Sequence, residues 1–465
     1  MQRHGTPAPD MSQQLATAPV TKLLIRLAIP TVLAQLVNLL YNIVDRIYIG
    51  HIPQVGEIAL TGVGLCFPVI YLMSAFAFLV GQGGAPRASI AMGQKNHQEA
   101  ERILGSCFTS LIVVAIPLTA VFLIWSRPLL YLFGASDNTI VYALPYMRIY
   151  ASGSIFVMLA LGLNLFITTQ GHTRFAMITV LIGAVTNIVL DPIFIYAFGM
   201  GVSGAALATI LSQALSAVFA VWFLTRSPQT DLRVRRQYLR PTKKVMLPVL
   251  ALGLAPFVMQ ATEAVLNVAF NASLYRYGGD IAVGAMTIAS TVMQMVWLPS
   301  QGIGQGAQPI MSYNYGAKNT KRVMQAFRSV LVLSAVYMTL LWALIQLWPQ
   351  VFIWIFNSES QALMETGIWT LRVYTAVLCL FCIQMAVQQA FLSIGMAKAS
   401  LFIACLRKVI LLIPLIYILP HFIENQVFAV FLAEPVSDII SITVSLVLFL
   451  TVFRREMRRI EPRTA

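Results

Sequence analysis

The chain has 465 residues, of which 58% are hydrophobic and only 10% are charged, and its formal net charge is +14. Soluble globular proteins carry about 25% charged residues, so this composition excludes an ordinary soluble protein. The apolar residues form blocks of roughly 20 or more, which is enough to cross a hydrocarbon layer about 30 Å thick. We therefore predict an all-α polytopic membrane protein, and we assign the basic excess to membrane topology rather than to nucleic-acid binding.

The hydrophobic blocks between turn signals predict twelve transmembrane helices. Their approximate ranges are 27–49, 58–80, 103–126, 139–170, 174–198, 203–225, 246–275, 281–312, 325–356, 362–393, 398–420 and 427–453. If the amino terminus is cytoplasmic, every inside segment contains Lys or Arg, whereas the outside turns together hold a single arginine, Arg276. The positive-inside rule therefore predicts that both termini are cytoplasmic.

An internal repeat divides the chain into two halves. "GQGGAPRASIAMGQKN" (81–96) matches "GQGAQPIMSYNYGAKN" (304–319), and a later pair of segments matches at nearly the same offset, about 223 residues. Six helices per repeat predict parallel repeats related by an axis along the membrane normal. We predict an N-lobe over 1–225, a basic cytoplasmic linker over 226–244 and a C-lobe over 245–465. The segment "GQGGAP" lacks the pattern of a phosphate-binding loop, and we expect a helix to end there with a flexible backbone.

Polar stripes run along one face of two predicted helices. In the first helix the stripe consists of Gln35, Asn38, Asn42 and Asp45. In the seventh helix it consists of Gln260, Glu263, Asn267 and Asn271. An interhelical hydrogen-bond seam explains the amides, but it gains little from the acids. Ionisable groups inside a membrane by default indicate function, so we interpret both stripes as lining a site.

A second acid lies in the fifth helix, in the segment "NIVLDPIFIYAFG". Asn187 and Asp191 are four residues apart and share a face, while Pro192 removes a backbone donor and loosens the preceding turn. A carboxylate, an amide and a freed carbonyl suit a proton or a cation, with Thr209 of the sixth helix as a fourth group. We predict that Asp45 lies close to Asp191 and that the two bind H⁺ or, transiently, Na⁺.

The second lobe carries a different set of polar residues. The counterpart of the fifth helix, "KVILLIPLIYILP", keeps Pro414 but has no acid. The twelfth helix instead contains Glu434 and Asp438, which either serve the C-lobe or bind substrate. Arg407 or Lys408 pairing with one of these acids is the structural alternative. Two residues of the tenth helix, Gln384 and Gln388, are expected to line a central cavity.

The sequence then resembles a known family. "AIPTVLAQLVNLLYNIVDRIYIG", "NIVLDPIFIYAFGMGVSGAALAT" and the duplicated "GQG…YGAKN" segment resemble the MATE family of multidrug and toxic compound extrusion transporters, most of all its bacterial MepA-like branch. The resemblance implies two six-helix bundles and antiport of organic cations, dyes and fluoroquinolones against H⁺ or Na⁺. It also implies an N-lobe ion site at Asp45, Asn187, Asp191 and Thr209. In another branch a seventh-helix Glu and a tenth-helix Asp bind the cation; Glu263 matches the first, but this tenth helix has no Asp.

We therefore predict a secondary multidrug antiporter in the bacterial inner membrane. Its expected partners are cationic or amphipathic drugs, H⁺ or Na⁺ and the lipid bilayer, and we expect a monomer without a cofactor or a resident metal. The alternative is a flippase for lipids or lipid-linked oligosaccharides, but such a protein should present many basic residues to an anionic headgroup. An enzyme is not expected, because no catalytic motif is found and Cys379 and Cys382 lie within an apolar run.

Overall fold

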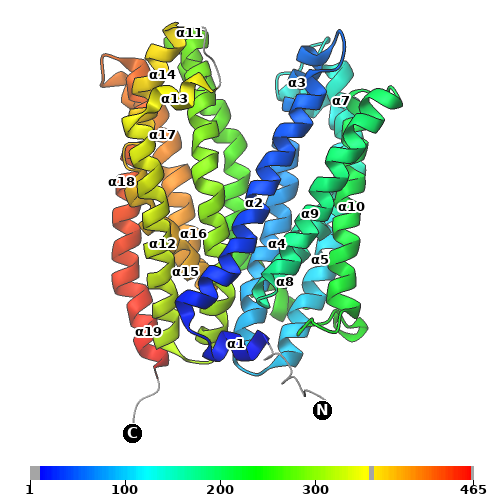
Figure 1. Cartoon of the computed structure of the whole chain (residues 1–465), viewed down its shortest axis with the longest axis vertical. Coiled ribbons are helices and arrows are strands. Elements are labelled where there is room, and N and C mark those ends of the chain that lie inside the picture. Colours follow the sequence, from blue (N-terminus) through cyan, green and yellow to red (C-terminus); the bar gives the residue numbers. More distant parts are fainter. Residues whose placement is uncertain (1–10, 356–360, 462–465) are drawn as a thin grey trace, which may run out of the picture.

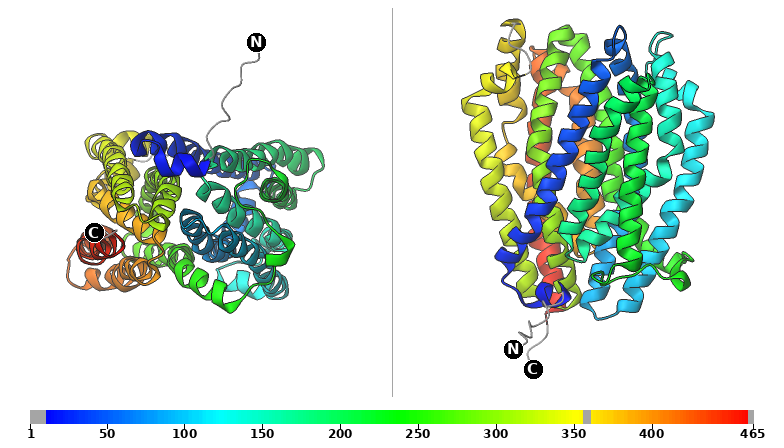
Figure 2. Two further views of the ribbon diagram at one scale, coloured as in Figure 1. Left: turned by 90° about the horizontal axis from the view of Figure 1, so that it is seen from below. Right: turned by 45° about the vertical axis from the view of Figure 1, so that its right-hand side comes forward.

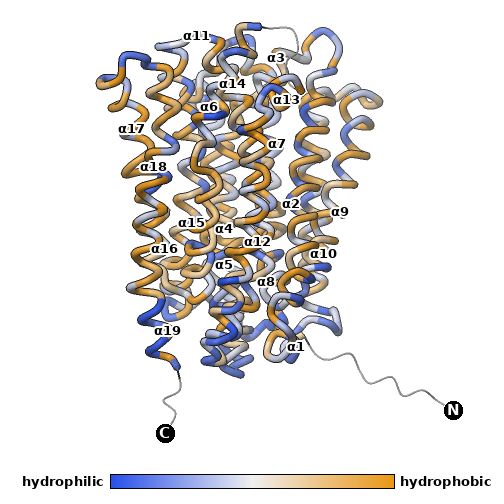
Figure 3. The backbone as a smooth tube through the Cα atoms, turned by 60° about the vertical axis from the view of Figure 1, so that its left-hand side comes forward, coloured by the Kyte–Doolittle hydropathy of each residue, from blue (hydrophilic) through white to orange (hydrophobic). Residues whose placement is uncertain are grey.

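Two groups of helices lie side by side in the computed structural model, which describes residues 11–355 and 361–461. The groups approach each other at the end that carries α1 (Met11–Thr17) and α19 (Arg454–Ile460), and they diverge toward the opposite end (Figure 1). Seen from below, the blue start of the chain runs along one side of both groups (Figure 2). Apolar residues dominate the middle of the helices, and polar residues gather at their ends (Figure 3).

The first group contains the helices of the first half of the chain. They are α2 (Val20–Gly50), α3 (Gly56–Gly64), α4 (Phe67–Gly93), α5 (His97–Ile124), α6 (Ser126–Leu132), α7 (Ile140–Ser152), α8 (Ser154–Thr169), α9 (Thr173–Pro192), the π-helical η1 (Ile193–Ala197) and α10 (Val202–Arg226). The short 3-10 helix η2 (Arg236–Tyr238) lies in the segment that connects α10 of the first group to α11 of the second group. The helices α7 and α8 form one span that is bent by 56°.

The second group begins with α11 (Lys243–Gly316). It continues with α12 (Thr320–Leu347), α13 (Pro349–Trp354), α14 (Gln361–Tyr374), α15 (Leu378–Ser393), α16 (Ala397–Cys405), the π-helical η3 (Leu406–Leu412), α17 (Ile413–Ile418), the 3-10 helix η4 (Leu419–His421), α18 (Gln426–Leu448) and the π-helical η5 (Phe449–Phe453). The helices α14 and α15 form a second bent span, with an angle of 45°. The end of predicted span 325–356 and most of the turn after it lie outside the described residues.

The number of spans agrees with the sequence pattern. Nine helices of the described chain are long and apolar enough to cross a membrane, and the two bent pairs bring the number to eleven. The twelfth comes from α11, because 74 residues would form a straight helix about 110 Å long, far more than a bilayer needs. The backbone leaves helical geometry at Gly279, where φ is 62° and ψ is −157°. The predicted all-helical membrane fold with twelve spans is therefore confirmed.

Glycines let α4 cross both arms of α11 at very short distance. A Cβ on Gly93 would lie 2.0 Å from the carbonyl oxygen of Tyr313, and one on Gly316 would lie 2.1 Å from that of Ile90. Gly93 and Gly316 are equivalent positions of the two repeats, and so are Ile90 and Tyr313, because 316 − 93 and 313 − 90 both equal 223. Each glycine therefore contacts the repeat-equivalent residue of the opposite helix. The close approach of the two groups at this end therefore depends on small residues.

The glycine-rich segment 81–86 does not end a helix as expected. α4 continues through it to Gly93, although Pro86 removes one backbone donor. The physical reason is packing against α11, since a Cβ on Gly83 would lie 2.1 Å from the carbonyl oxygen of Val249. Glycine here permits contact between helices instead of a flexible terminus.

The start of the chain packs into the second group. Leu15, Leu23 and Leu27 are buried in one core cluster with residues of α11, α12, α15, α16, η5 and α19. Arg322 donates from Nη2 to the carbonyl oxygens of Leu15 and Ala18, at 3.0 and 2.7 Å. The contact holds α1 beneath the end where the two groups meet.

Candidate functional site

The buried acid of the fifth span lies at the end of α9, directly before the π-helical segment η1. Asp191 and Asn187 are both fully buried, and Asn187 donates from Nδ2 to Asp191 Oδ1 at 3.2 Å. The same amide lies 3.4 Å from the hydroxyl of Thr209 on α10, and that hydroxyl donates to the carbonyl oxygen of Ala205. The i, i+4 spacing on α9 thus directs the amide and the carboxyl group to one point.

Asp45 of α2 completes this cluster. Its carboxyl group neighbours the Asp191 carboxyl group, because α2 packs along α9. Three buried oxygens, Asp45 Oδ1, Asn187 Oδ1 and Asp191 Oδ2, receive no hydrogen bond from any described residue. Two neighbouring carboxylates repel each other in a medium of low dielectric constant, so a proton or a cation placed between them removes that repulsion. The donor set consists of oxygens, as hard cations prefer.

Three acids of the second group, Glu263, Glu434 and Asp438, are arranged differently, because each is paired with a base. Arg407 donates from Nε to Asp438 Oδ1 at 2.7 Å and from Nη2 to Glu434 Oε1 at 2.6 Å. Lys408 pairs with Glu263 and also donates to the carbonyl oxygen of Met259. The pairing that the sequence left open therefore exists for Arg407, whereas Lys408 takes a different acid. Both bases lie on η3, where a π-helical turn directs consecutive residues to different partners.

Two adjoining pockets lie beside these ion pairs. The first spans about 340 Å³ and the second about 800 Å³, both volumes including space open to the outside, and they share Met259, Trp297, Met385 and Gln388. The larger pocket has no charged residue in its wall, and seven glutamines line it: Gln82, Gln260, Gln301, Gln305, Gln308, Gln388 and Gln389. Phe78 and Gln82 come from α4, so both helix groups contribute to the cavity.

Besides the paired acids Glu263, Glu434 and Asp438, the polar residues singled out from the sequence divide into three sets. Asp45, Asn187, Asp191 and Thr209 meet in the first helix group. Gln260, Gln384 and Gln388 line the pockets, and Gln384 accepts a hydrogen bond from Ser441. Of the other amides, Gln35 donates to the side chain of Gln305 on α11, whereas Asn42 donates to the carbonyl oxygen of Asn38 and Asn267 to that of Glu263, each within its own helix.

Some residues of the cavity were not identified from the sequence. Gln82 and Gln305 face the same cavity and are 305 − 82 = 223 residues apart, so the duplicated "GQG" motif already carried this signal. Trp297 lies on an apolar stretch of α11 and had no such signal. The sequence pattern indicates only a structural pairing for Arg407 and Lys408, yet both line the smaller pocket.

These features define a class of protein. A chain of two helix groups with a buried acidic pair in one and a polar cavity between them is a polytopic membrane protein with the architecture of a transporter. The family model MatE matches residues 30–193 and 256–418, two segments whose first residues are 256 − 30 = 226 apart. The chain belongs to the MATE family of multidrug efflux transporters, whose members are transporters and not enzymes.

Individual relatives agree with this assignment. The chain is similar to the multidrug export protein MepA of Staphylococcus haemolyticus, with 25% identity over 74% of this chain and 75% of the relative. Identity to MepA of Staphylococcus aureus is 24% over 86% of this chain and 88% of the relative.

The solved structures agree in fold. One, described as an outward-facing conformation of a multidrug resistance MATE family transporter, matches with a TM-score of 0.89 and 23% identity, over 98% of this chain and 99% of that one. A MATE structure in the straight conformation matches with a TM-score of 0.88 and 23% identity over the same shares.

Proposed function

We propose that the protein is a secondary active antiporter, which exchanges amphipathic drugs for H⁺ or Na⁺ by alternating access across a bacterial inner membrane. The observation that carries the proposal is the contact between Asp45 and Asp191, together with the three buried oxygens that no described donor reaches. A proton or Na⁺ bound there stabilises one arrangement of the first helix group more than the other. Differential binding of this kind is what an ion needs to shift a conformational equilibrium.

The orientation of the chain supports export. The basic segments place α1 and α19 on the cytoplasmic side, so the separated ends of the helix groups face outward. In this arrangement a drug is released outside and an external ion has access to the acids. Movement of one helix group against the other would then open the cytoplasmic side.

Ion gradients test the proposal and identify the ion. The full-length protein is reconstituted in liposomes, and drug movement is recorded with a pH gradient alone and then with a Na⁺ gradient alone. We expect one gradient to drive drug in the direction opposite to the ion, and dissipation of that gradient to stop it. Drug movement that is the same with and without either gradient would contradict the antiport proposal.

The alternative of a flippase has less support. An anionic lipid headgroup requires several uncompensated bases in the cavity. In the two described pockets the charged lining residues are Arg407 and Lys408, and each is paired with a carboxylate.

A further inference from the structure

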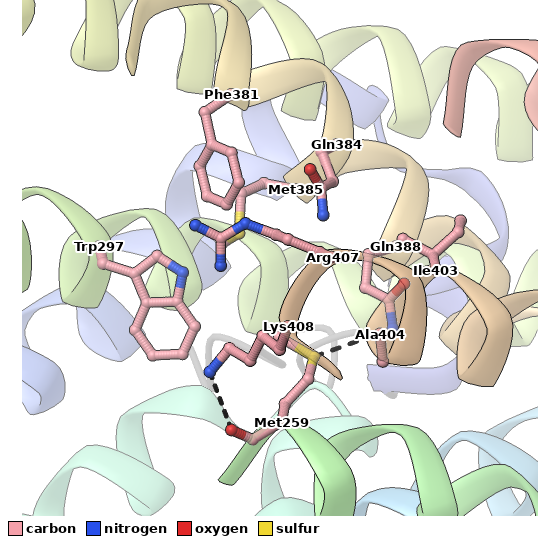
Figure 4. A pocket seen from close by; sticks show the side chains of 10 residues that line it. All are labelled: Met259, Trp297, Phe381, Gln384, Met385, Gln388, Ile403, Ala404, Arg407 and Lys408. Atoms are coloured by element: carbon pink, nitrogen blue, oxygen red, sulfur yellow. Dashed lines mark hydrogen bonds between the residues drawn. The ribbon is translucent and has the colours of Figure 1, made fainter. Parts of the chain in front are cut away.

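Arg407 is held rigidly at the wall of the smaller pocket. Two of its nitrogens bind Asp438 and Glu434, and its guanidinium carbon lies 4.6 Å from the centre of the Phe381 ring. The two acids are 4% exposed, and the arginine side chain is 12% exposed. Among the described residues no acceptor is found for the remaining nitrogen, Nη1. Figure 4 shows the guanidinium group beneath Phe381 and facing the side of the pocket where Trp297 lies.

The bases and the acids of this cluster differ in their relation to the pocket wall. Arg407 and Lys408 belong to the pocket wall, whereas Glu434, Asp438 and Glu263 line neither pocket. A ligand in the pocket therefore meets these N–H donors, while one oxygen of each carboxylate is bound by a base and Glu434 Oε2 has no hydrogen-bond partner among the described residues. Two bases nevertheless face three carboxylates, so the cluster has no positive excess that would favour a net anion. The arrangement suits a ligand of zero net charge that offers an oxygen acceptor.

The remainder of the cavity fits an aromatic ligand with polar groups. Trp297 and Phe381 provide flat apolar surfaces, and methionines adapt to ligands of different shape. Two buried amide atoms have no hydrogen-bond partner in the described chain: Gln308 Nε2, on a side chain that is 3% exposed, and Gln388 Oε1. Unpaired buried polar atoms cost free energy, so a ligand that supplies one acceptor and one donor there is stabilised.

We propose that Arg407 sets the charge selectivity of this cavity. It binds the carbonyl or carboxylate oxygen of an aromatic amphipathic compound that is neutral or zwitterionic, and by occupying Glu434 and Asp438 it disfavours permanent cations. The inference rests on the proposed drug transport and identifies the substrate class of its cavity.

Two substitutions change the charge in opposite directions. Arg407→Gln leaves Glu434 and Asp438 without their counter-charge, which converts the pocket into a site for cations. The double variant Glu434→Gln/Asp438→Asn leaves the guanidinium uncompensated, which strengthens its attraction for a carboxylate. Arg372→Gln is the matched control, because it removes one positive charge from an exposed position on α14 that lines neither pocket.

The test uses two dyes with one aromatic body: a rhodamine with a free carboxylate, which is zwitterionic, and its methyl ester, which is a cation. Their Kd values are measured by fluorescence anisotropy with the full-length protein in detergent. The wild-type protein and Arg372→Gln should bind the free acid more tightly than the ester. Arg407→Gln should shift the ratio of the two Kd values toward the ester by about tenfold or more, and the double variant should shift it toward the acid.

The possible results separate this inference from the transport proposal. A Kd ratio that favours the ester in the wild type, or that both variants leave unchanged, overturns the role of Arg407. Absence of binding of either dye to the wild type also overturns it. If Arg407→Gln does not fold, the Kd ratio of Glu434→Gln/Asp438→Asn alone tests the role of Arg407. Ion-driven drug movement is measured separately, so its failure refutes antiport and leaves the dye ratio to be judged independently.

Discussion

Among the described residues Asp191 has no base beside it, unlike Glu263, Glu434 and Asp438 of the second helix group. Its described neighbours are the amide of Asn187, the hydroxyl of Thr209 through that amide, and the carboxyl group of Asp45. The charge of Arg46 acts on Asp45, but the groups that meet at the site are two carboxyl groups and neutral oxygens, so the site itself changes its charge only by taking up or losing an ion. For that reason we place ion coupling in the first helix group and not at Glu434 or Asp438, where Arg407 already supplies a permanent positive charge.

Substitution of either acid tests this assignment. Asp191→Asn and Asp45→Asn should each abolish ion-driven drug efflux while the protein still inserts and folds, because an amide retains the size of the side chain but loses the ionisable group. Drug resistance of expressing cells and efflux from liposomes measure the effect. Asp137→Asn, at an exposed acid near Tyr131, is the control and should behave like wild type. Normal efflux by Asp191→Asn would rule out the assignment.

The Lys408–Glu263 pair should act mainly on stability. Removing one partner of a buried ion pair costs about 3–5 kcal/mol, and Glu263 is 36% exposed, so we expect Glu263→Gln to lie near the low end of that range. Thermal unfolding in detergent should show a lower Tm for Glu263→Gln and recovery in Glu263→Gln/Lys408→Met. Ion-driven efflux should fall less than in Asp191→Asn. If Tm does not recover in the double variant, loss of the Lys408–Glu263 ion pair is not the cause of the lower Tm of Glu263→Gln.

At the scale of elements, both ionic clusters adjoin π-helical turns. η1 follows Asp191 and Pro192, and η3 carries Arg407 and Lys408. A π-helical turn shifts the direction of the side chains that follow it, and such turns are frequent at functional sites. Because η3 departs from the regular α-helical period, that period does not predict which acids pair with Arg407 and Lys408 in the eleventh span.

The short helix α1 should depend on Arg322 for its position. This side chain donates to two carbonyl oxygens at the end of α1, and it also donates to the side chain of Asn314. Hydrogen bonds from a charged donor are worth about 1.5–3 kcal/mol each, so Arg322→Ala should raise amide hydrogen exchange over residues 11–18 roughly tenfold or more. The exposed neighbour Lys321→Ala is the control. Unchanged exchange in Arg322→Ala would mean that apolar contacts alone hold α1.

For the whole molecule, the glycine contacts between α4 and α11 should control which side is closed. Ala at position 93 or 316 would place a methyl group about 2 Å from a backbone oxygen of the opposite helix. We expect Gly93→Ala and Gly316→Ala to separate the two groups at the α1 end. Spin-label distances between the groups at that end should increase. Gly64→Ala, where a Cβ meets nothing within 4 Å, should change nothing. If the spin-label distances at the α1 end are the same in all three variants, the glycine contacts do not control closure at that end.

Several of these features were predictable from local patterns in the sequence. The i, i+4 spacing of Asn187 and Asp191 and the polar face of α2 are properties of single helices, and the structure brings these residues together. The partners of Arg407 and Lys408 depend on how η3 is rotated against α11 and α18, which one sequence does not specify. The roles of Gly93 and Gly316 likewise appear only when the two repeats are placed against each other.

We propose that Asp45 and Asp191 couple ion movement to drug movement. This coupling is tested by recording drug-induced ion flux in liposomes that contain either the wild-type protein or Asp191→Asn, with a pH-sensitive or Na⁺-sensitive dye inside. Addition of drug should cause movement of one of the two ions in the opposite direction in the wild type and none in Asp191→Asn. Equal drug-induced ion flux in both proteins would contradict the account.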